Sequence, residues 1–404
     1  LAFLARARQR AGEEEAGKEA MRLAVEAVKG NSLDVEGYKA RVTEMQEMDM
    51  SYMADSEWMA HAMAEGEALL GELNTDMAHS RGTLSREAAR TKWTEISLAY
   101  MRVGAWKSAQ RAAIRARDYA GSSHHLALAN AILHIVRCLF ALGEAPQTVT
   151  FSAKFRKWTD IPPETVAHLR AAVGVGYLAA GSFKSAARVL VDVTAALDSA
   201  FNYVATMADV AVYGALTALA SFDRHELKSL VLNSASFKPL LELVPAIGEL
   251  VADFYGSRYH ACLGALDSLR LRLALDPYLA PHLDALYAAI RSKALIQYFS
   301  PFRSVDLNRM AEAFSTSLDG ITAEVAALIV AGDISARIDS ENSILYASHT
   351  DQRASTFHAA LKAGAQFERQ TRAMLFRVNL QRAGFVVEQP PSARAPTSGA
   401  AGSE

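Results

Sequence analysis

The sequence predicts a mainly α protein: an array of TPR-like helical hairpins, then a winged-helix module, then one long C-terminal helix. Three observations lead to this fold class. A small residue recurs every 37 to 39 residues through the middle of the chain, and in four of the five units an aromatic residue follows two places later, the exception being Ala145. After residue 332 the spacing of apolar residues changes from that of a helix to that of a strand. Beyond residue 351 the apolar positions follow a strict heptad.

These patterns divide the chain into five predicted segments. They are an N-terminal helical region (1–85), a hairpin array (86–300), a winged-helix part (301–350), an assembly helix (351–387) and a disordered tail (388–404). The tail is assigned from its prolines and small polar residues. Because the sequence begins at Leu1 without an initiator methionine, we expect further chain upstream.

The hairpin repeat is clearest in two stretches that align without a gap, Tyr100–Ala109 and Tyr177–Ala186. We expect the small residue of each unit to let two helices approach at the turn, and the aromatic residue to fill the gap between neighbouring hairpins. Chance recurrence in an alanine-rich helical protein is the alternative. The small residues at the expected turns are Gly104, Gly143, Gly181, Ala220 and Ser257.

The segment Ser304–Ala347 has the element order of a winged helix: helix, helix, strand, turn, strand. Ser304 is the expected N-cap of the first helix, and Thr316 with Asp319 fits a capping box that opens the second. Gly332 is expected to end that second helix.

The two strands of this module supply the first predicted interface. We predict that Ile344–Ala347 is an edge strand, whose unpaired backbone groups would pair with a strand of another protein. The predicted interface residues here are Ile334, Ala336, Ile338, Ile344, Leu345 and Tyr346.

The charge of the module argues against nucleic acid. It carries only Arg309 and Arg337 against seven acidic residues, and the whole chain has 42 basic and 44 acidic residues. A nucleic-acid reader needs lysine and arginine to displace counterions from phosphates. We therefore expect protein partners and no nucleic acid.

The segment from Gln352 to about Arg382 predicts a helix with a heptad seam. A period of 3.5 residues favours pairing with other helices. Two interpretations stay open: the helix joins helices of other subunits, which is favoured, or it docks back on its own chain. The predicted interface residues on the seam are Phe357, Ala360, Gly364, Phe367, Thr371, Met374 and Val378.

The search for chemistry yields no catalytic, cofactor or metal site. Gly174, Gly176 and Ala179 match a dinucleotide-binding pattern, but no strand precedes them. No two histidines have the spacing of a zinc site. Asp223–Glu226 has the composition of an acid–base site, although a solvated turn and helix start is favoured over an enzyme hypothesis there.

Compartment signals are sparse. Cys138 and Cys262 cannot form a disulfide framework and indicate a reduced intracellular setting. Val204–Ala220 is the longest apolar candidate span, but Asp209 interrupts it and it is shorter than the roughly 20 residues that a bilayer requires. We expect a buried helix there and no membrane association.

Several stretches carry a resemblance to one family. Val212–Leu227 and Arg291–Phe302 are similar to PCI-domain proteins, and specifically to subunit-one members of the COP-nine signalosome. The matches span roughly residues 90 to 385. Further matching stretches are Arg115–Tyr119, Ser236–Leu243, Tyr278–His282, Ala336–Ser340 and Ile344–Ala347.

The resemblance implies a right-handed superhelix of hairpins that leads into a winged helix, the two forming a PCI module. It implies a non-catalytic scaffold subunit of the complex that removes the ubiquitin-like modifier NEDD from cullins and so regulates cullin-RING ubiquitin ligases. Partners would be other PCI and MPN subunits, with the zinc isopeptidase in another subunit, no cofactor here, and a location in nucleus and cytoplasm. A PCI subunit of the proteasome lid or of translation initiation factor three is the alternative.

Overall fold

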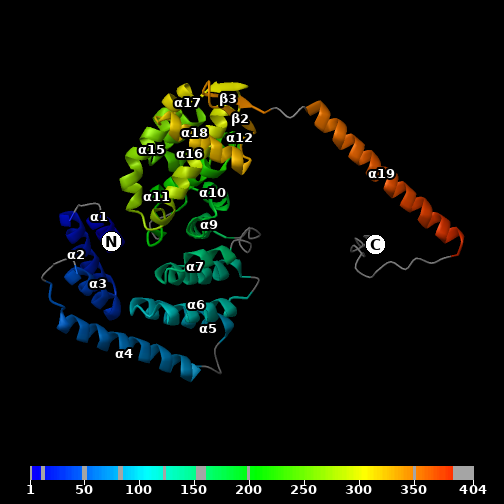
Figure 1. Cartoon of the computed structure of the whole chain (residues 1–404). Helices are drawn as coiled ribbons and strands as arrows, with labels where there is room; N and C mark the ends of the chain where they lie inside the picture. The colour runs from blue at the N-terminus through cyan, green and yellow to red at the C-terminus, as the bar shows by residue number, and fades with distance from the viewer. Residues whose placement is uncertain are drawn as a thin grey trace.

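The computed structural model covers residues 1–404. Nearly all of its regular secondary structure is helical (Figure 1). The described residues are 2–10, 14–47, 52–80, 85–121, 124–151, 161–197, 201–348 and 352–384. Within them the strands form one three-stranded sheet near the C-terminal end. The predicted fold class is thus confirmed, whereas the predicted tail at 388–404 lies outside the described residues.

Four helices form the N-terminal region, with a small core of their own that buries Met21, Tyr38 and Met45. This region joins the array where the Leu33 backbone N–H donates to the Arg102 carbonyl at 2.7 Å. The long fourth helix runs beside the others toward the array (Figure 1). The helices are α1 (Ala2–Arg10), α2 (Glu14–Asn31), α3 (Val35–Glu47) and α4 (Ser56–Ser80).

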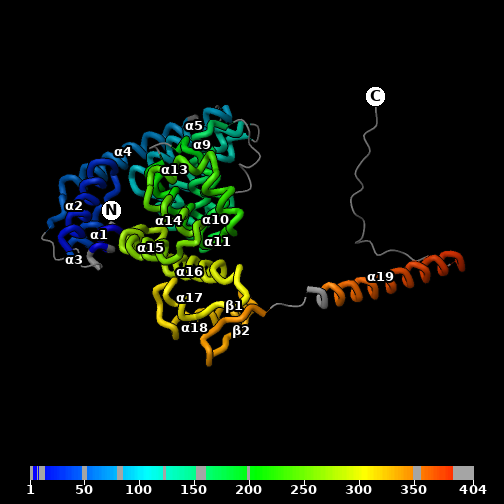
Figure 2. Tube along the Cα trace, turned by 90° about the horizontal axis from the view of Figure 1, so that it is seen from above, coloured from blue at the N-terminus to red at the C-terminus, as the bar shows by residue number. Residues whose placement is uncertain are grey.

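The array follows as stacked hairpins, whose layers are visible in both orientations (Figures 1 and 2). One core runs from Ala113 into the winged helix, while a small separate cluster of Met101, Ala109 and Cys138 lies at the start of the array. The elements are α5 (Arg86–Arg102), α6 (Trp106–Tyr119), α7 (His125–Ala141), η1 (Ala145–Phe151), α9 (Pro163–Ala179), α10 (Phe183–Val191), α11 (Met207–Ser221), α12 (Arg224–Glu226), η3 (Leu227–Leu232), α13 (Lys238–Glu242), α14 (Pro245–Tyr255), α15 (Tyr259–Ala274), η4 (Ala280–His282) and α16 (Leu283–Phe299).

Four of the five expected turn residues have left-handed backbone conformations. The φ angles are 79° at Gly104, 75° at Gly143, 73° at Gly181 and 61° at Ser257. After each, the next N–H donates to the carbonyl five residues earlier, at 2.8 to 2.9 Å, which is the long hydrogen bond of a Schellman motif. The repeat therefore selects small residues mainly because the turn needs positive φ, a different reason from the close approach we expected.

The fifth expected turn residue is a correction. Ala220 lies inside α11, and the chain leaves that helix at Phe222 with an extended backbone, φ −82° and ψ 146°. No left-handed residue is needed there. The aromatic residue of the unit, Phe222, is nevertheless buried.

The aromatic residues of the repeat fill gaps as expected in the last unit. Tyr259 stacks on Phe314 with ring centroids 5.7 Å apart and meets Tyr298 edge-on at 6.2 Å. Because Phe314 follows α17 (Leu307–Ala313), this stack joins the array to the winged helix.

The glycines of the dinucleotide-like pattern lie in the middle of α9, where they allow close packing. A Cβ on Gly174 would lie 2.4 Å from a Leu190 methyl, and one on Gly176 would lie 1.9 Å from the Thr148 hydroxyl. The pattern thus reflects the approach of α10 and η1 to α9. It forms no phosphate-binding loop.

The expected buried helix at 204–220 is α11, whose apolar side chains Val210, Leu216 and Leu219 are fully buried. Among the described residues, no single helix combines the length and apolar composition needed to cross a membrane. Only α17 with α18 (Leu318–Ala331), a pair bent by 100°, reaches that threshold jointly.

The winged-helix module contains α17, α18 and the strands β1 (Ser304–Asp306), β2 (Ala336–Asp339) and β3 (Ile344–Ala347). Two expected caps are corrected. Asp306 caps α17 by accepting from the Asn308 N–H at 2.8 Å, because Ser304 is taken into β1. Ser317 caps α18 in place of Thr316. Gly332 ends α18 with φ 84°, as predicted.

Candidate subunit interface

The sheet of the winged helix has the order β1-β3-β2, all antiparallel. Leu345 of β3 is opposite Val305 on one side and Ile338 on the other. The prediction that β3 is an edge strand is therefore wrong. The reason is β1, a three-residue strand that the sequence analysis missed. Its only local signal is Val305 alternating with polar Ser304 and Asp306.

Burial further changes the first predicted interface. Ile334, Ala336 and Leu345 are buried, and Ile338 and Ile344 are half-buried. Ile334, Ala336 and Leu345 belong to the main core and Ile338 packs against it, so these four side chains hold the sheet to the core. Tyr346 alone of the six is exposed, at 45 %. Subunit contact at this site stays a prediction, and a charge placed at Leu345 would test folding before it tested contact.

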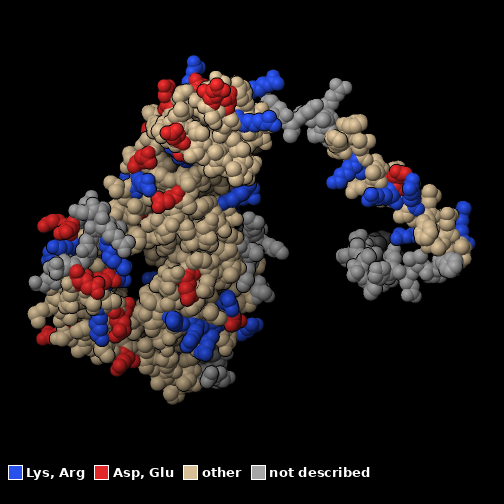
Figure 3. Space-filling view, in the orientation of Figure 1, with Lys and Arg blue, Asp and Glu red and all other residues tan. Residues whose placement is uncertain are grey.

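The accessible parts of the sheet are its outer strands and one face. Tyr346 stands opposite Ser304 and Arg337, so these three side chains form a row across the exposed face. β2 ends the sheet on one side, and an outer strand presents backbone groups that another strand can pair with. Around this end of the molecule, acidic and basic side chains are interspersed (Figure 3).

The winged helix is held to the array by Arg291 of α16. The Arg291 Nε donates to a carboxylate oxygen of Glu324 in α18 at 2.9 Å, and a terminal guanidinium nitrogen donates to the Thr316 hydroxyl. The same guanidinium lies 6.0 Å from the ring centroid of Phe314. These contacts fix the orientation of the sheet relative to the array.

The second predicted interface lies on α19 (Gln352–Arg382), which stands apart from the rest of the chain in both views (Figures 1 and 2). Large apolar side chains on it are exposed, including Phe357 at 62 %, Phe367 at 70 % and Met374 at 71 %. Both interpretations of this helix, joining helices of other subunits and docking on its own chain, stay predictions. The seam residues Phe357, Ala360, Gly364, Phe367, Thr371, Met374 and Val378 are all exposed, and their contact with other subunits stays a prediction.

The apolar surface of α19 is wider than the heptad analysis indicated. Leu361 and Leu375 are exposed at 55 % and 58 %. Each lies four residues after a seam position, Phe357 or Thr371, so the i, i+4 spacing could have found them. We call the seven seam residues together with Leu361 and Leu375 the α19 stripe.

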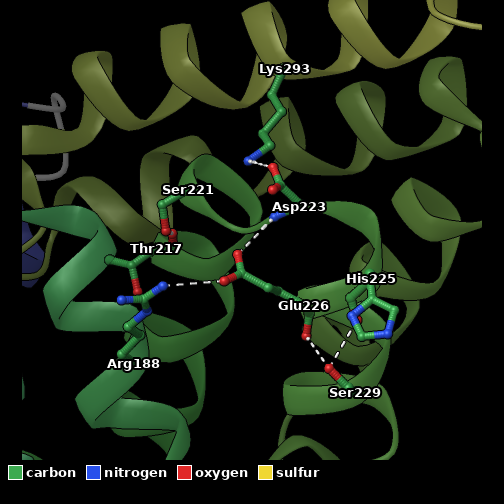
Figure 4. A network of polar contacts seen from close by, with 8 residues as sticks. All are labelled: Arg188, Thr217, Ser221, Asp223, His225, Glu226, Ser229 and Lys293. Atoms are coloured by element: carbon green, nitrogen blue, oxygen red, sulfur yellow. Dashed lines mark hydrogen bonds and ion pairs between the residues drawn. The ribbon is translucent and has the colours of Figure 1, made fainter. Parts of the chain in front are cut away.

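The segment Asp223–Glu226, the one enzyme hypothesis, forms a helix cap (Figure 4). The Glu226 carboxylate accepts from the Asp223 backbone N–H at 3.2 Å, which lowers the pKa of Glu226, and from Arg188 at 3.3 Å. His225 is exposed, and its ring points away from the Glu226 carboxylate (Figure 4). The carboxylates are thus engaged in capping and ion pairs.

The two cysteine thiols and the possible metal ligands among the described residues also form no reactive site. Cys138 and Cys262 are buried free thiols, and burial raises their pKa values to about 11 and about 12. In the parts of the chain that the structure describes, no group of three or more His, Cys, Asp or Glu residues lies where it could hold a metal ion.

Comparisons with known proteins agree with this architecture. Residues 55–230 match the family described as 26S proteasome subunit RPN7, and residues 266–349 match the PCI domain. COP9 signalosome complex subunit 1 of Arabidopsis thaliana is 41 % identical over 332 residues, 81 % of this chain and 74 % of the plant protein. Subunit 1b of Drosophila melanogaster is 36 % identical over 84 % of this chain and 65 % of its own length. A 26S proteasome non-ATPase regulatory subunit 6 of Oryza sativa is 28 % identical over 47 % of this chain and 49 % of its own length.

Proposed function

The chain belongs to the COP9 signalosome subunit 1 family, and on that premise we propose that it is a non-catalytic scaffold subunit of the signalosome. The observation that carries the scaffold role is the α19 stripe. Nine side chains, six of them large and apolar, face solvent along a helix that stands clear of its own chain. Large exposed apolar patches mark protein interaction sites.

The chemistry of the stripe suits a helical bundle. Gly364 and Ala360 on the seam leave room for a close helix approach, while Phe357, Phe367 and Met374 supply apolar area. Burying such side chains is worth roughly 1.5–3 kcal/mol each before the entropy cost of association is subtracted. The winged-helix edge at β2 is the second proposed contact.

Deletion of residues 352–387 tests the bundle role. The shortened chain should fold and should no longer copurify with other PCI and MPN subunits of the complex. Retention at the level of the unaltered chain would show that α19 is dispensable for assembly.

A matched pair of substitutions tests the stripe itself. Phe367→Ser with Met374→Ser removes apolar area from the stripe, and we expect reduced copurification. Lys362→Ser with Arg369→Ser lies on the opposite face, since residues seven apart share a face and these two are about half a turn from the stripe. Copurification of this control pair should be unchanged. Equal loss in both pairs would indicate a general effect on the helix.

We further propose that the complex containing this chain acts on cullin-RING ubiquitin ligases by removing the NEDD modifier, with the zinc isopeptidase in another subunit. The isolated chain should then have no isopeptidase activity on a modified cullin, while the complex that copurifies with it should have that activity. Activity of the isolated chain would overturn the non-catalytic role.

We propose that the chain is located in the nucleus and the cytoplasm, as the family resemblance implies. Cell fractionation with detection of the native chain tests this location. The proteasome-lid alternative has weaker support, because the similarity there is lower and covers less of the chain. Mass spectrometry of the copurifying complex separates the two, since proteasome lid subunits in place of signalosome subunits would exclude our proposal.

A further inference from the structure

A groove crosses the first hairpins of the array, far along the chain from the winged helix and α19. Its main hollow, of about 630 Å³, lies between the start of α5 and the turn from α6 to α7. A second hollow continues from it past Arg86 and Tyr119 toward Trp93. A third continues past Arg90 and Asn130 toward α9. Neighbouring hollows share lining residues, so the three lie side by side along α5, and together we call them a groove.

The groove is basic. Its walls carry Arg86, Arg90, Arg115 and Arg137, and we call it the basic groove. Lysine and arginine side chains are gathered over this part of the array (Figure 3). The lining includes two carboxylates. Asp118 is paired with Arg117 at 2.8 Å, and Glu87 approaches Arg90 only to 3.8 Å.

Three of the four arginines have no acidic partner among the described residues. In the described part of the chain, no carboxylate lies within ion-pair distance of Arg86, Arg115 or Arg137. Unpaired cations that share one concave surface attract anions and are costly to leave together. The groove therefore carries positive charge that the described residues do not neutralise.

Two of these arginines are held in place by aromatic rings. The Arg115 guanidinium lies 4.6 Å from the ring centroid of Trp93, and that of Arg137 lies 5.1 Å from that of Tyr203. A stacked guanidinium keeps its N–H edge available, and this edge matches the two oxygens of a carboxylate. The stacking reduces the entropy lost when such an anion binds.

Apolar side chains lie beside the cations. Tyr119, Leu126 and Tyr203 line the groove and are 40 %, 44 % and 41 % exposed. An occupant that satisfies both features carries carboxylates interspersed with apolar side chains. We propose that the basic groove binds an extended acidic segment of a partner protein.

Nucleic acid fits the groove less well. It carries a charge at every nucleotide, and its binding proteins neutralise many phosphates with lysine and arginine. Here four arginines and two carboxylates, Glu87 and Asp118, line the surface, so the excess of positive charge is only two and suits a segment with a few carboxylates better than an unbroken run of phosphates. The inference is independent of the assembly role proposed above, because no groove residue belongs to the winged helix or to α19.

Binding to the full-length chain tests the proposal. The probe is a fluorescein-labelled peptide of about twelve residues that alternates glutamate or aspartate with leucine and phenylalanine, followed by fluorescence anisotropy. We expect saturable binding that weakens as salt is raised. The same peptide with glutamine and asparagine in place of its acids should bind at least about tenfold more weakly, a difference of about 1.4 kcal/mol.

Variants locate the site. Arg115→Glu with Arg137→Glu should weaken peptide binding at least tenfold, while Lys362→Glu with Arg369→Glu, an equal charge change on α19, should leave it unchanged. Arg115→Lys with Arg137→Lys keeps the charge and should weaken peptide binding less than the glutamate pair does. The circular dichroism spectra of both double variants should match that of the unaltered chain, which shows that they fold.

Four results would overturn the proposal. They are absence of peptide binding by the unaltered chain, equal weakening by the α19 pair, no weakening by the folded groove pair, and tighter binding of a single-stranded oligonucleotide than of the peptide.

Discussion

Tyr213 and Asp276 are 63 residues apart in the sequence, yet the Tyr213 hydroxyl donates a 2.5 Å hydrogen bond to the Asp276 carboxylate. The other carboxylate oxygen accepts from the backbone N–H groups of Tyr278 and Leu279 at 2.8 and 3.1 Å. Tyr213 lies in α11 and Asp276 in the turn after α15. The pair thus links the middle of the array to the last hairpin before the winged helix.

Removal of the Tyr213 hydroxyl is predicted to destabilise this link. Tyr213→Phe leaves a buried carboxylate oxygen without its donor, so we expect the free energy of unfolding to fall by about 1–3 kcal/mol. Urea unfolding followed by circular dichroism measures the change. Tyr346→Phe, on an exposed tyrosine, should change stability by less than about 0.5 kcal/mol. An equal change in both would show that the Tyr213 hydrogen bond is not the cause.

The stability of the array should depend on the protonation of Asp276. Burial raises the pKa of Asp276 above its usual 3.8, and the hydrogen bonds from Tyr213 and the backbone offset this only in part. A carboxyl with a raised folded-state pKa binds its proton more tightly when folded, so its stabilisation is present below the unfolded pKa and is lost as pH rises through the folded pKa.

Comparison with Asp276→Asn isolates this effect, because asparagine does not titrate. The unaltered chain minus the variant should show a stability difference that falls as pH is raised from about 3.5 to 7. Urea midpoints at a series of pH values measure it. A difference that rises with pH would mean that hydrogen bonding outweighs burial and that the pKa is lowered.

The left-handed turns predict opposite effects of alanine at two glycines. Gly143 has φ 75°, and Gly71 lies within α4; a Cβ at either would meet no atom within 4 Å. Gly143→Ala should therefore cost about 1–2 kcal/mol through backbone strain alone. Gly71→Ala should stabilise by up to about 1 kcal/mol, because alanine favours the helix. Thermal or urea unfolding of the pair decides the matter, and a stabilising Gly143→Ala would refute the role of positive φ.

The attachment of the winged helix is predicted to depend on Arg291. Arg291→Ala removes the contacts to Glu324 and Thr316, so amide hydrogen exchange in α17, α18 and the sheet should become faster. Exchange in α5 to α7 should be unchanged. Arg270→Ala, which breaks the exposed pair with Asp284, serves as the control and should leave the winged helix protected. Unaltered protection in Arg291→Ala would place the attachment in the shared apolar core, including the stack of Tyr259 on Phe314.

Features that depend on neighbours in the sequence were predictable from it. The positive φ at Gly332, the helical heptad of α19 and most of the hairpin turns follow from residue types and spacings within a few positions. The helix caps lie two residues after Ser304 and one residue after Thr316, at Asp306 and Ser317. Which of several neighbouring polar side chains caps a helix depends on where the backbone enters the helical conformation.

The sequence by itself determined the class of this protein: stacked hairpins, a winged helix, an apolar heptad helix and a family resemblance that the comparisons confirm. The tertiary structure alone decided which strand is central, which interface residues are buried and where the basic groove lies. The physical reason is distance along the chain. Val305 and Leu345, which pair in the sheet, are 40 residues apart in the sequence. Arg90 and Arg137, which line the same hollow, are 47 residues apart, so no local pattern encodes either contact.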